Sequence, residues 1–167
     1  MYSIQSHYTG AACDGTPYSV TALENSTCTA EMETCTAYEG NSSTITADMI
    51  SIECTNDYVT AMRQKFGDSP YVFQITYQDE SCSSFSIGYG FPASGNCEGS
   101  FNESESYYVV ARLNSSGSSS IEYFSANPCL SDSWYMTQIA TTPILAKDSR
   151  YPSALSLELA SGFLSSC

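Results

Sequence analysis

Residues 2–8 read Tyr-Ser-Ile-Gln-Ser-His-Tyr, and residues 71–77 read Tyr-Val-Phe-Gln-Ile-Thr-Tyr, with both Tyr and the Gln at matching positions. Each segment places large apolar side chains at alternate positions, Tyr2 and Ile4 in the first. That pattern is typical of a β-strand with two different faces. We therefore expect two equivalent strands, each opening one structural unit.

The match continues along the chain when the sequence is shifted by 69 residues without gaps. Two pairs of cysteines coincide in this register, Cys13 with Cys82 and Cys28 with Cys97. Because cysteine and glutamine seldom coincide by chance, this register favours a tandem duplication. The sequence thus predicts a first β-rich repeat unit over residues 1–68 and a second unit, ending in a C-terminal strand, over residues 69–167.

Each unit is expected to contain about four strands stapled by disulfides. After the opening strand, strands are expected at 18–23, 34–38 and 44–54 in the first unit and at 85–91, 107–113 and 119–124 in the second. The last two strands of each unit should form a hairpin. Gly, Asn and Ser, the residues that such turns need, fill segments 39–43 and 114–117.

One segment, 57–66, fits a helix that connects the two units. Asp57 or Asn56 can cap it and Gly67 can end it. The corresponding segment of the second unit, 131–140, is too rich in β-prone residues to favour a helix. The tail predicts a final strand through three alternating residues, Leu155, Leu157 and Leu159. The expected fold class is therefore mainly β, a β-rich α+β arrangement.

The chain is acidic, with a net charge of -13 over 167 residues. That charge argues against a nucleic-acid partner, because phosphate binding needs clustered Lys and Arg. It also argues against binding to an anionic membrane surface. No apolar run is long enough to span a bilayer. A cationic partner, or a polymer that is recognised through its hydroxyl groups, remains compatible with the charge.

Eight cysteines in a chain of this size indicate an oxidising, extracellular compartment. If equivalent positions pair equivalently, the favoured disulfides are Cys13–Cys28, Cys82–Cys97, Cys35–Cys54 and Cys129–Cys167. Pairing of Cys13 with Cys35 or with Cys54 remains open as an alternative.

Four glycosylation sequons support the same compartment, at Asn25, Asn41, Asn102 and Asn114. Asn41 and Asn114 fall in the expected hairpin turns, where a glycan meets no steric obstacle. They should therefore be the best-occupied sites, whereas Asn25 lies close to a cysteine. The sequence predicts a secreted glycoprotein.

The residue types that catalysis needs are scarce. His7 is the single histidine, so any triad would have to use it, and no Gly-x-Ser-x-Gly motif occurs. Two groups of acidic residues lie in polar, turn-like stretches: Asp79 with Glu80, and Glu103 with Glu105. For both groups, acidic residues in solvated loops are a simpler interpretation than the catalytic pair of a glycosidase. No calcium-binding loop motif is present. We expect no catalytic site, no metal site and no cofactor, and hence not an enzyme.

Aromatic residues are abundant, with 13 Tyr and one Trp. Most of the tyrosines fit half-buried strand positions, which their β propensity favours. The pairs Tyr107-Tyr108 and Trp134-Tyr135 are harder to place in a core, because each pair faces both sides of a strand. Such rings can stack on sugars.

Three stretches carry a resemblance to a known group of proteins. They are residues 8–18 with Glu24-Asn-Ser-Thr-Cys28, residues 65–72 with Asp79-Glu-Ser-Cys82, and Gly95-Asn-Cys97-Glu-Gly-Ser. Over roughly residues 2–135 the chain resembles the Ser/Thr- and Cys-rich extracellular proteins of oomycetes, including outer modules of receptor-like kinases. The resemblance implies secretion or display outside the cell, and it carries no catalytic residues.

The expected function is that of a secreted structural protein that assembles with copies of itself into a surface layer or fibre. Exposed strand edges are templates for another chain. Near the ends of the chain, the least charged strand candidates are residues 2–8, with Tyr2 and Ile4, and residues 153–160, with the three leucines. The alternative is a glycan-binding or adhesion module, a receptor-like ectodomain that recognises cell-wall polysaccharide.

Overall fold

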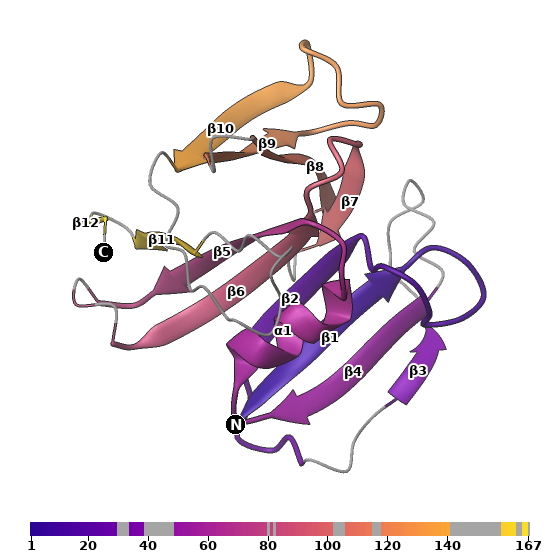
Figure 1. Ribbon diagram of the computed structural model, residues 1–167, viewed down its shortest axis with the longest axis vertical. Helices are drawn as coiled ribbons and strands as arrows, with labels where there is room; N and C mark the ends of the chain where they lie inside the picture. Colours follow the sequence, from indigo (N-terminus) through magenta and orange to yellow (C-terminus); the bar gives the residue numbers. More distant parts are fainter. Residues whose placement is uncertain are drawn as a thin grey trace.

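The computed structural model describes residues 1–29, 34–38, 49–79, 81, 83–101, 106–114, 118–140, 158–162 and 165–166. Within these residues the chain forms two β-sheets and one α-helix (Figure 1), so the mainly-β expectation is confirmed. No helix in this part of the chain is long and apolar enough to cross a membrane.

The larger sheet has eight strands in the order β12-β11-β5-β6-β2-β1-β4-β3, and the smaller sheet has four in the order β10-β9-β8-β7. The strands of the larger sheet are β1 (Tyr2–Tyr8), β2 (Ser19–Glu24), β3 (Thr34–Ala37), β4 (Met49–Thr55), β5 (Tyr71–Tyr77), β6 (Phe85–Pro92), β11 (Glu158–Gly162) and β12 (Ser165–Ser166). Those of the smaller sheet are β7 (Glu98–Phe101), β8 (Ser106–Leu113), β9 (Ser119–Phe124) and β10 (Trp134–Ala140).

The elements form three layers (Figure 1). Helix α1 (Tyr58–Phe66) covers one face of the larger sheet, where Ile4, Phe66 and Phe73 belong to one buried apolar cluster. The smaller sheet packs on the opposite face, where Val72 and Val109 belong to a second cluster. The alternating strands of the larger sheet are therefore covered on both sides where β5 and β6 run.

Helix α1 begins and ends as its sequence predicts. The carboxylate of Asp57 accepts a hydrogen bond from the backbone N–H of Thr60 at 3.1 Å, which satisfies one of the free donors of the first turn. Gly67 ends the helix with φ at 55°, a conformation that favours glycine. The face formed by Ala61, Met62 and Phe66 is buried against the sheet.

Two glycines of β6 allow this helix to approach the sheet. A methyl group at Gly90 would lie 2.9 Å from Cε2 of Phe66, which is closer than real Cβ contacts. At Gly88 the nearest atoms, on Ala22 and Met62, would lie at an ordinary 3.4 Å. The aromatic side chains of the helix and of β5 therefore occupy the space above the bare backbone of residue 90.

The expected strands are present, and both expected hairpin pairings are confirmed. β3 pairs antiparallel with β4, and β8 pairs antiparallel with β9. In the second hairpin the backbone N–H of Asn114 donates to the carbonyl of Ser118 at 2.8 Å, so the turn lies where its residues place it. The first turn, with segment 39–48, lies outside the described residues. β7 and β12 were not expected from the sequence.

The two units share only part of their architecture. β1 pairs antiparallel with β2, and β5 pairs antiparallel with β6, as equivalent strands should. Beyond these two pairings the strand orders of the two segments differ. β4 lies beside β1 in the larger sheet, whereas β9 lies between β8 and β10 in the smaller one. β2 also pairs with β6, so the larger sheet combines strands of the segments 1–68 and 69–167. The duplication therefore stays a prediction.

Candidate functional site

The N-terminal strand cannot offer an edge to a neighbouring molecule. β1 lies between β2 and β4, and residues from Tyr2 to His7 have backbone partners on both sides. Ile4 is fully buried beneath α1. The expectation that Tyr2 and Ile4 form an assembly strand is therefore wrong, because a strand with two paired edges has no free hydrogen-bonding groups to add a third.

The C-terminal strand also pairs within its own chain. β11, which contains Leu159, runs parallel to β5 with Leu159 opposite Gln74. Leu155 and Leu157 lie outside the described residues. The alternation of leucines in the tail predicts a strand but does not indicate its parallel pairing with β5.

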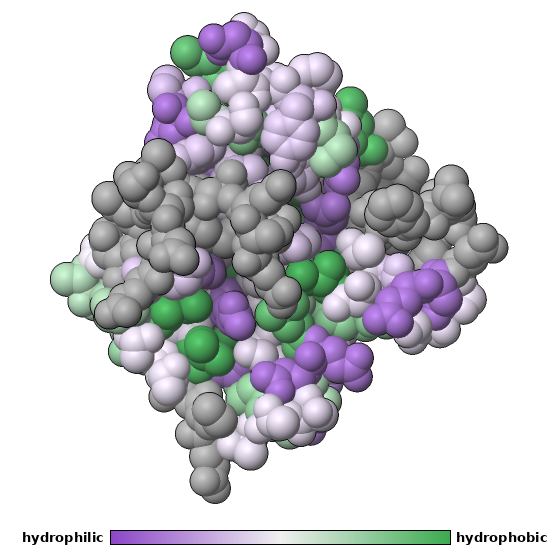
Figure 2. Space-filling view, turned by 180° about the vertical axis from the view of Figure 1, so that it is seen from behind, coloured by the Kyte–Doolittle hydropathy of each residue, from purple (hydrophilic) through white to green (hydrophobic). Residues whose placement is uncertain are grey.

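An exposed edge is found instead at β10, which pairs on one side with β9 and forms the margin of the smaller sheet (Figure 1). Four of the six exposed large apolar side chains in the described part of the chain lie on this strand. They are Trp134 at 49%, Tyr135 at 52%, Met136 at 38% and Ile139 at 66% exposure. Seen from behind, the top of Figure 2, over the smaller sheet, mixes pale residues with hydrophilic and hydrophobic ones.

The edge begins with a bulge that changes the direction of its aromatic rings. Trp134 lies opposite Phe124 and Met136 opposite Tyr123, so Tyr135 is the extra residue. The Tyr135 ring lies 6.1 Å from that of Tyr123, and the indole N–H of Trp134 donates to Oγ1 of Thr137 at 2.9 Å. The exposed aromatic side chains therefore have fixed neighbours.

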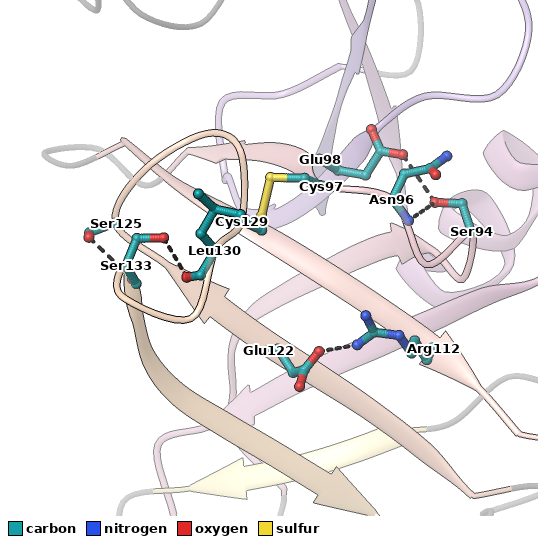
Figure 3. Close-up of a disulfide and its surroundings, with 10 residues drawn as sticks. All are labelled: Ser94, Asn96, Cys97, Glu98, Arg112, Glu122, Ser125, Cys129, Leu130 and Ser133. Carbon is teal, nitrogen blue, oxygen red and sulfur yellow. Dashed lines mark hydrogen bonds and ion pairs between the residues drawn. A yellow bond between two sulfur atoms is a disulfide. The ribbon is translucent and has the colours of Figure 1, made fainter.

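Behind β10 the smaller sheet is held by a disulfide and an ion pair (Figure 3). Cys97 and Cys129 join the start of β7 to the loop that precedes β10. In that loop, the Ser133 hydroxyl donates to the Leu130 carbonyl at 2.9 Å. Arg112 of β8 pairs with Glu122 of β9. These contacts make β10 the outer margin of a supported sheet.

The cysteines pair differently from the favoured expectation. The disulfides are Cys13–Cys35, Cys28–Cys54 and Cys97–Cys129. The favoured pairings Cys13–Cys28, Cys35–Cys54, Cys82–Cys97 and Cys129–Cys167 are therefore wrong, and the alternative of Cys13 with Cys35 is confirmed. Cys82 and Cys167 lie outside the described residues. Three disulfides within one chain are compatible with an extracellular protein.

Two of the four sequons lie within the described residues. Asn114 is exposed at the end of β8, in the β8–β9 turn. Asn25 follows β2, and its side-chain Oδ1 accepts hydrogen bonds from the backbone N–H and the hydroxyl of Thr27. Asn41 and Asn102 lie outside the described residues. Occupancy of all four sites stays a prediction.

For His7 and Asp79, the two described candidates for acid–base chemistry, the local structure explains the shifted pKa values. His7 is 4% exposed, and burial lowers its pKa to about 4, so the ring is neutral at physiological pH. The carboxylate of Asp79 accepts hydrogen bonds from the backbone and hydroxyl of Ser83, which lower its pKa to about 2. Glu80, Glu103 and Glu105 lie outside the described residues. Among the residues that the structure describes, no group of side chains could hold a metal ion.

The two aromatic pairs have different environments. Tyr108 is buried in a cluster near the Cys97–Cys129 disulfide, while Tyr107 packs against the layer between the sheets, where burial raises its pKa to about 12. That pair therefore belongs to the core. Trp134 and Tyr135 remain exposed, as the sequence pattern suggested for a pair that faces both sides of a strand.

Comparison of the chain with family models, with curated proteins and with solved structures gave no match.

Proposed function

We propose that this protein is a secreted structural protein that assembles with copies of itself through the edge of β10. The observation that carries the proposal is the concentration of exposed apolar side chains on β10, which forms one margin of the smaller sheet among the residues that the structure describes. Such an edge is a template for another strand, and soluble proteins usually protect it with charge, proline or a covering element. The disulfides support the extracellular location, and the proposal includes no catalysis.

Charge permits this contact. The chain has a net charge of -13, so two copies repel each other at long range. At an ionic strength of about 0.15 M that repulsion is screened beyond ~8 Å. The strand itself, Trp-Tyr-Met-Thr-Gln-Ile-Ala, has no charged residue. Close approach at β10 therefore brings backbone and apolar groups together without placing like charges in the contact.

The edge that β10 meets decides the form of the assembly. Two β10 strands paired about a two-fold axis would close into a dimer. An open filament requires β10 to meet a different edge, and β3, whose four residues are all exposed, lies far from β10 at the margin of the larger sheet (Figure 1). We propose this heterologous contact, because it extends without closing.

The test places a charge on the edge. Ile139→Lys puts a lysine, a residue that natural edges use against pairing, at a side chain that is 66% exposed. Leu130→Lys is the matched control, since it changes a 55% exposed side chain in the preceding loop by the same chemistry. Sedimentation velocity and electron microscopy should show assembly of the natural protein and of the control, and monomers for Ile139→Lys. A natural protein that stays monomeric at high concentration and physiological salt would refute the proposal.

The exposed rings of Trp134 and Tyr135 favour one alternative, a glycan-binding or adhesion module. Aromatic side chains with a polar tip suit a wet surface and can stack on sugar rings. This alternative requires a monomer that binds oligosaccharide saturably and loses that binding with Trp134→Ala.

A further inference from the structure

The tyrosines of this chain differ widely in exposure. The structure describes every tyrosine except Tyr151, and among the described ones a single tyrosine is exposed, Tyr135 on β10, at 52%. Five of the others are buried, at 2–6% exposure, and the remaining ones are half-buried. A second protein molecule can therefore reach Tyr135 far more readily than any other tyrosine that the structure describes.

The position of Tyr135 keeps its ring at the surface. It is the extra residue of the β10 bulge, between Trp134 and Met136, and a bulge changes the direction of a side chain relative to the sheet. Strand β10 is also the margin of the smaller sheet, so no further strand covers it among the described residues. The ring packs against that of Tyr123, with the two centroids 6.1 Å apart, and much of the residue still faces solvent.

Tyrosines deeper in the molecule are protected from oxidation. The Tyr107 ring lies 5.6 Å from that of Tyr123, and the Tyr123 hydroxyl donates to Oε1 of Gln74. Burial raises the pKa of Tyr107 to about 12 and that of Tyr123 well above its usual value, so both phenols hold their protons. A phenol that loses an electron at neutral pH must also release its proton. Water accepts that proton readily at Tyr135, so oxidation is directed to the exposed ring.

We propose that Tyr135 is a site of oxidative cross-linking, where its ring becomes joined to Tyr135 of a second copy of this chain. The second copy is the partner because its own Tyr135 is the matching exposed phenol. Both rings lie at the margin of a sheet (Figure 1), so neither has to enter a cleft to meet the other. The strand around them, residues 134–140, carries no charge. Repulsion between the acidic chains is screened beyond ~8 Å at an ionic strength of about 0.15 M.

The co-reactant is hydrogen peroxide, acting through a haem peroxidase. Each phenol gives up one electron and its hydroxyl proton, so two neutral phenoxyl radicals form. The radicals join through one ring carbon beside each oxygen, and the hydrogens on those two carbons then move to the oxygens, which restores both phenols in a dityrosine. The peroxide accepts the two electrons and the two protons and leaves as two molecules of water. The new carbon–carbon bond, unlike a disulfide, is not exchanged by thiols.

The inference does not rest on assembly through β10, because coupling requires two exposed rings to meet only once. The test therefore uses the Ile139→Lys protein as its parent, in which the edge of β10 stays uncovered whether or not the natural protein assembles. With a haem peroxidase and hydrogen peroxide, this parent should form a covalent dimer that survives reducing, denaturing electrophoresis and shows dityrosine fluorescence. Adding Tyr135→Phe should abolish the dimer. That change removes one exposed hydroxyl, so the melting temperature should stay the same.

Tyr77→Phe is the matched control. It removes the same hydroxyl from a half-buried ring that packs against the apolar cluster beneath α1, so the dimer should form as before. Tyr151→Phe, outside the described residues, and Trp134→Phe, which removes the neighbouring oxidisable indole, should also keep the dimer. The inference is overturned if the parent forms no dimer, if Tyr135→Phe dimerises as fully as the parent, or if peptide mapping places the dityrosine at another residue.

Discussion

Gly90→Ala tests how α1 packs on the larger sheet. The added methyl group would lie 2.9 Å from Cε2 of Phe66 and 3.0 Å from Cε1 of Phe73. Neither ring can turn into solvent, because Phe66 is 2% exposed and Phe73 is fully buried. The methyl group must therefore displace the helix, the rings or the backbone of β6.

The size of the effect follows from two opposing contributions. Overpacking of a well-packed core costs about 1–3 kcal/mol. Replacing glycine reduces the freedom of the unfolded chain and returns roughly 0.4–1 kcal/mol. We expect Gly90→Ala to lower the free energy of unfolding by about 1–2 kcal/mol. Gly88→Ala, whose methyl group would meet its nearest neighbours at 3.4 Å, should be neutral or slightly stabilising.

The measurement is guanidinium denaturation with the disulfides intact, which compares midpoints at equal m-values. Gly88→Ala is the matched control, since it lies on the same strand and adds the same group over the same helix. A Gly90→Ala protein as stable as Gly88→Ala would refute the reasoning, because it would mean that the rings are not packed against residue 90.

Two further predictions concern His7 and the cysteines. Burial lowers the pKa of His7 to about 4 from an unfolded value near 6.5, so the unfolded state binds the proton first. The contribution of His7 to the free energy of unfolding is therefore complete above pH 6.5 and falls by about 3 kcal/mol as the pH drops to 4. In denaturation curves at pH 7 and pH 4.5, His7→Gln should remove that part of the pH dependence. Proteolysis without reduction should release peptides joined through Cys13–Cys35, Cys28–Cys54 and Cys97–Cys129. Removing the last pair together should cost about 3–4 kcal/mol, since its separation of 32 residues closes a long loop, and equal stability of that double variant would contradict the assignment.

Local patterns predicted the elements well, because their causes are local. The alternation in residues 2–8 and the caps at Asp57 and Gly67 depend on neighbours a few residues away. The disulfides depend on which strands lie side by side. Cys28 follows β2 and Cys54 lies in β4, and β1 inserts between those two strands. No repeat in the sequence encodes that insertion.

The edges were misjudged for a related reason. Residues 2–8 carry no charge when His7 is neutral, and this suggested a strand that is free to pair with a neighbouring molecule. The same lack of charge suits a central strand, whose two faces and two edges are all covered. The exposed strand was signalled by Trp134-Tyr135, one of the two aromatic pairs that were hard to place in a core; the other, Tyr107-Tyr108, belongs to the core. Its place at a margin follows from the order β10-β9-β8-β7 in the smaller sheet, and no pairing partner of β10 was expected from the sequence.

The central place of β1 also bears on the order in which strands can pair while the chain is being synthesised. Its two partners, β2 and β4, and the disulfides Cys13–Cys35 and Cys28–Cys54 all lie within the first 55 residues. The other edge of β2 pairs with β6, which reaches from Phe85 to Pro92. If a nascent chain pairs and cross-links these first strands before β6 is made, it has an open edge on β2 until β6 arrives. Because open edges recruit other strands, that interval is when the growing chain most needs a chaperone.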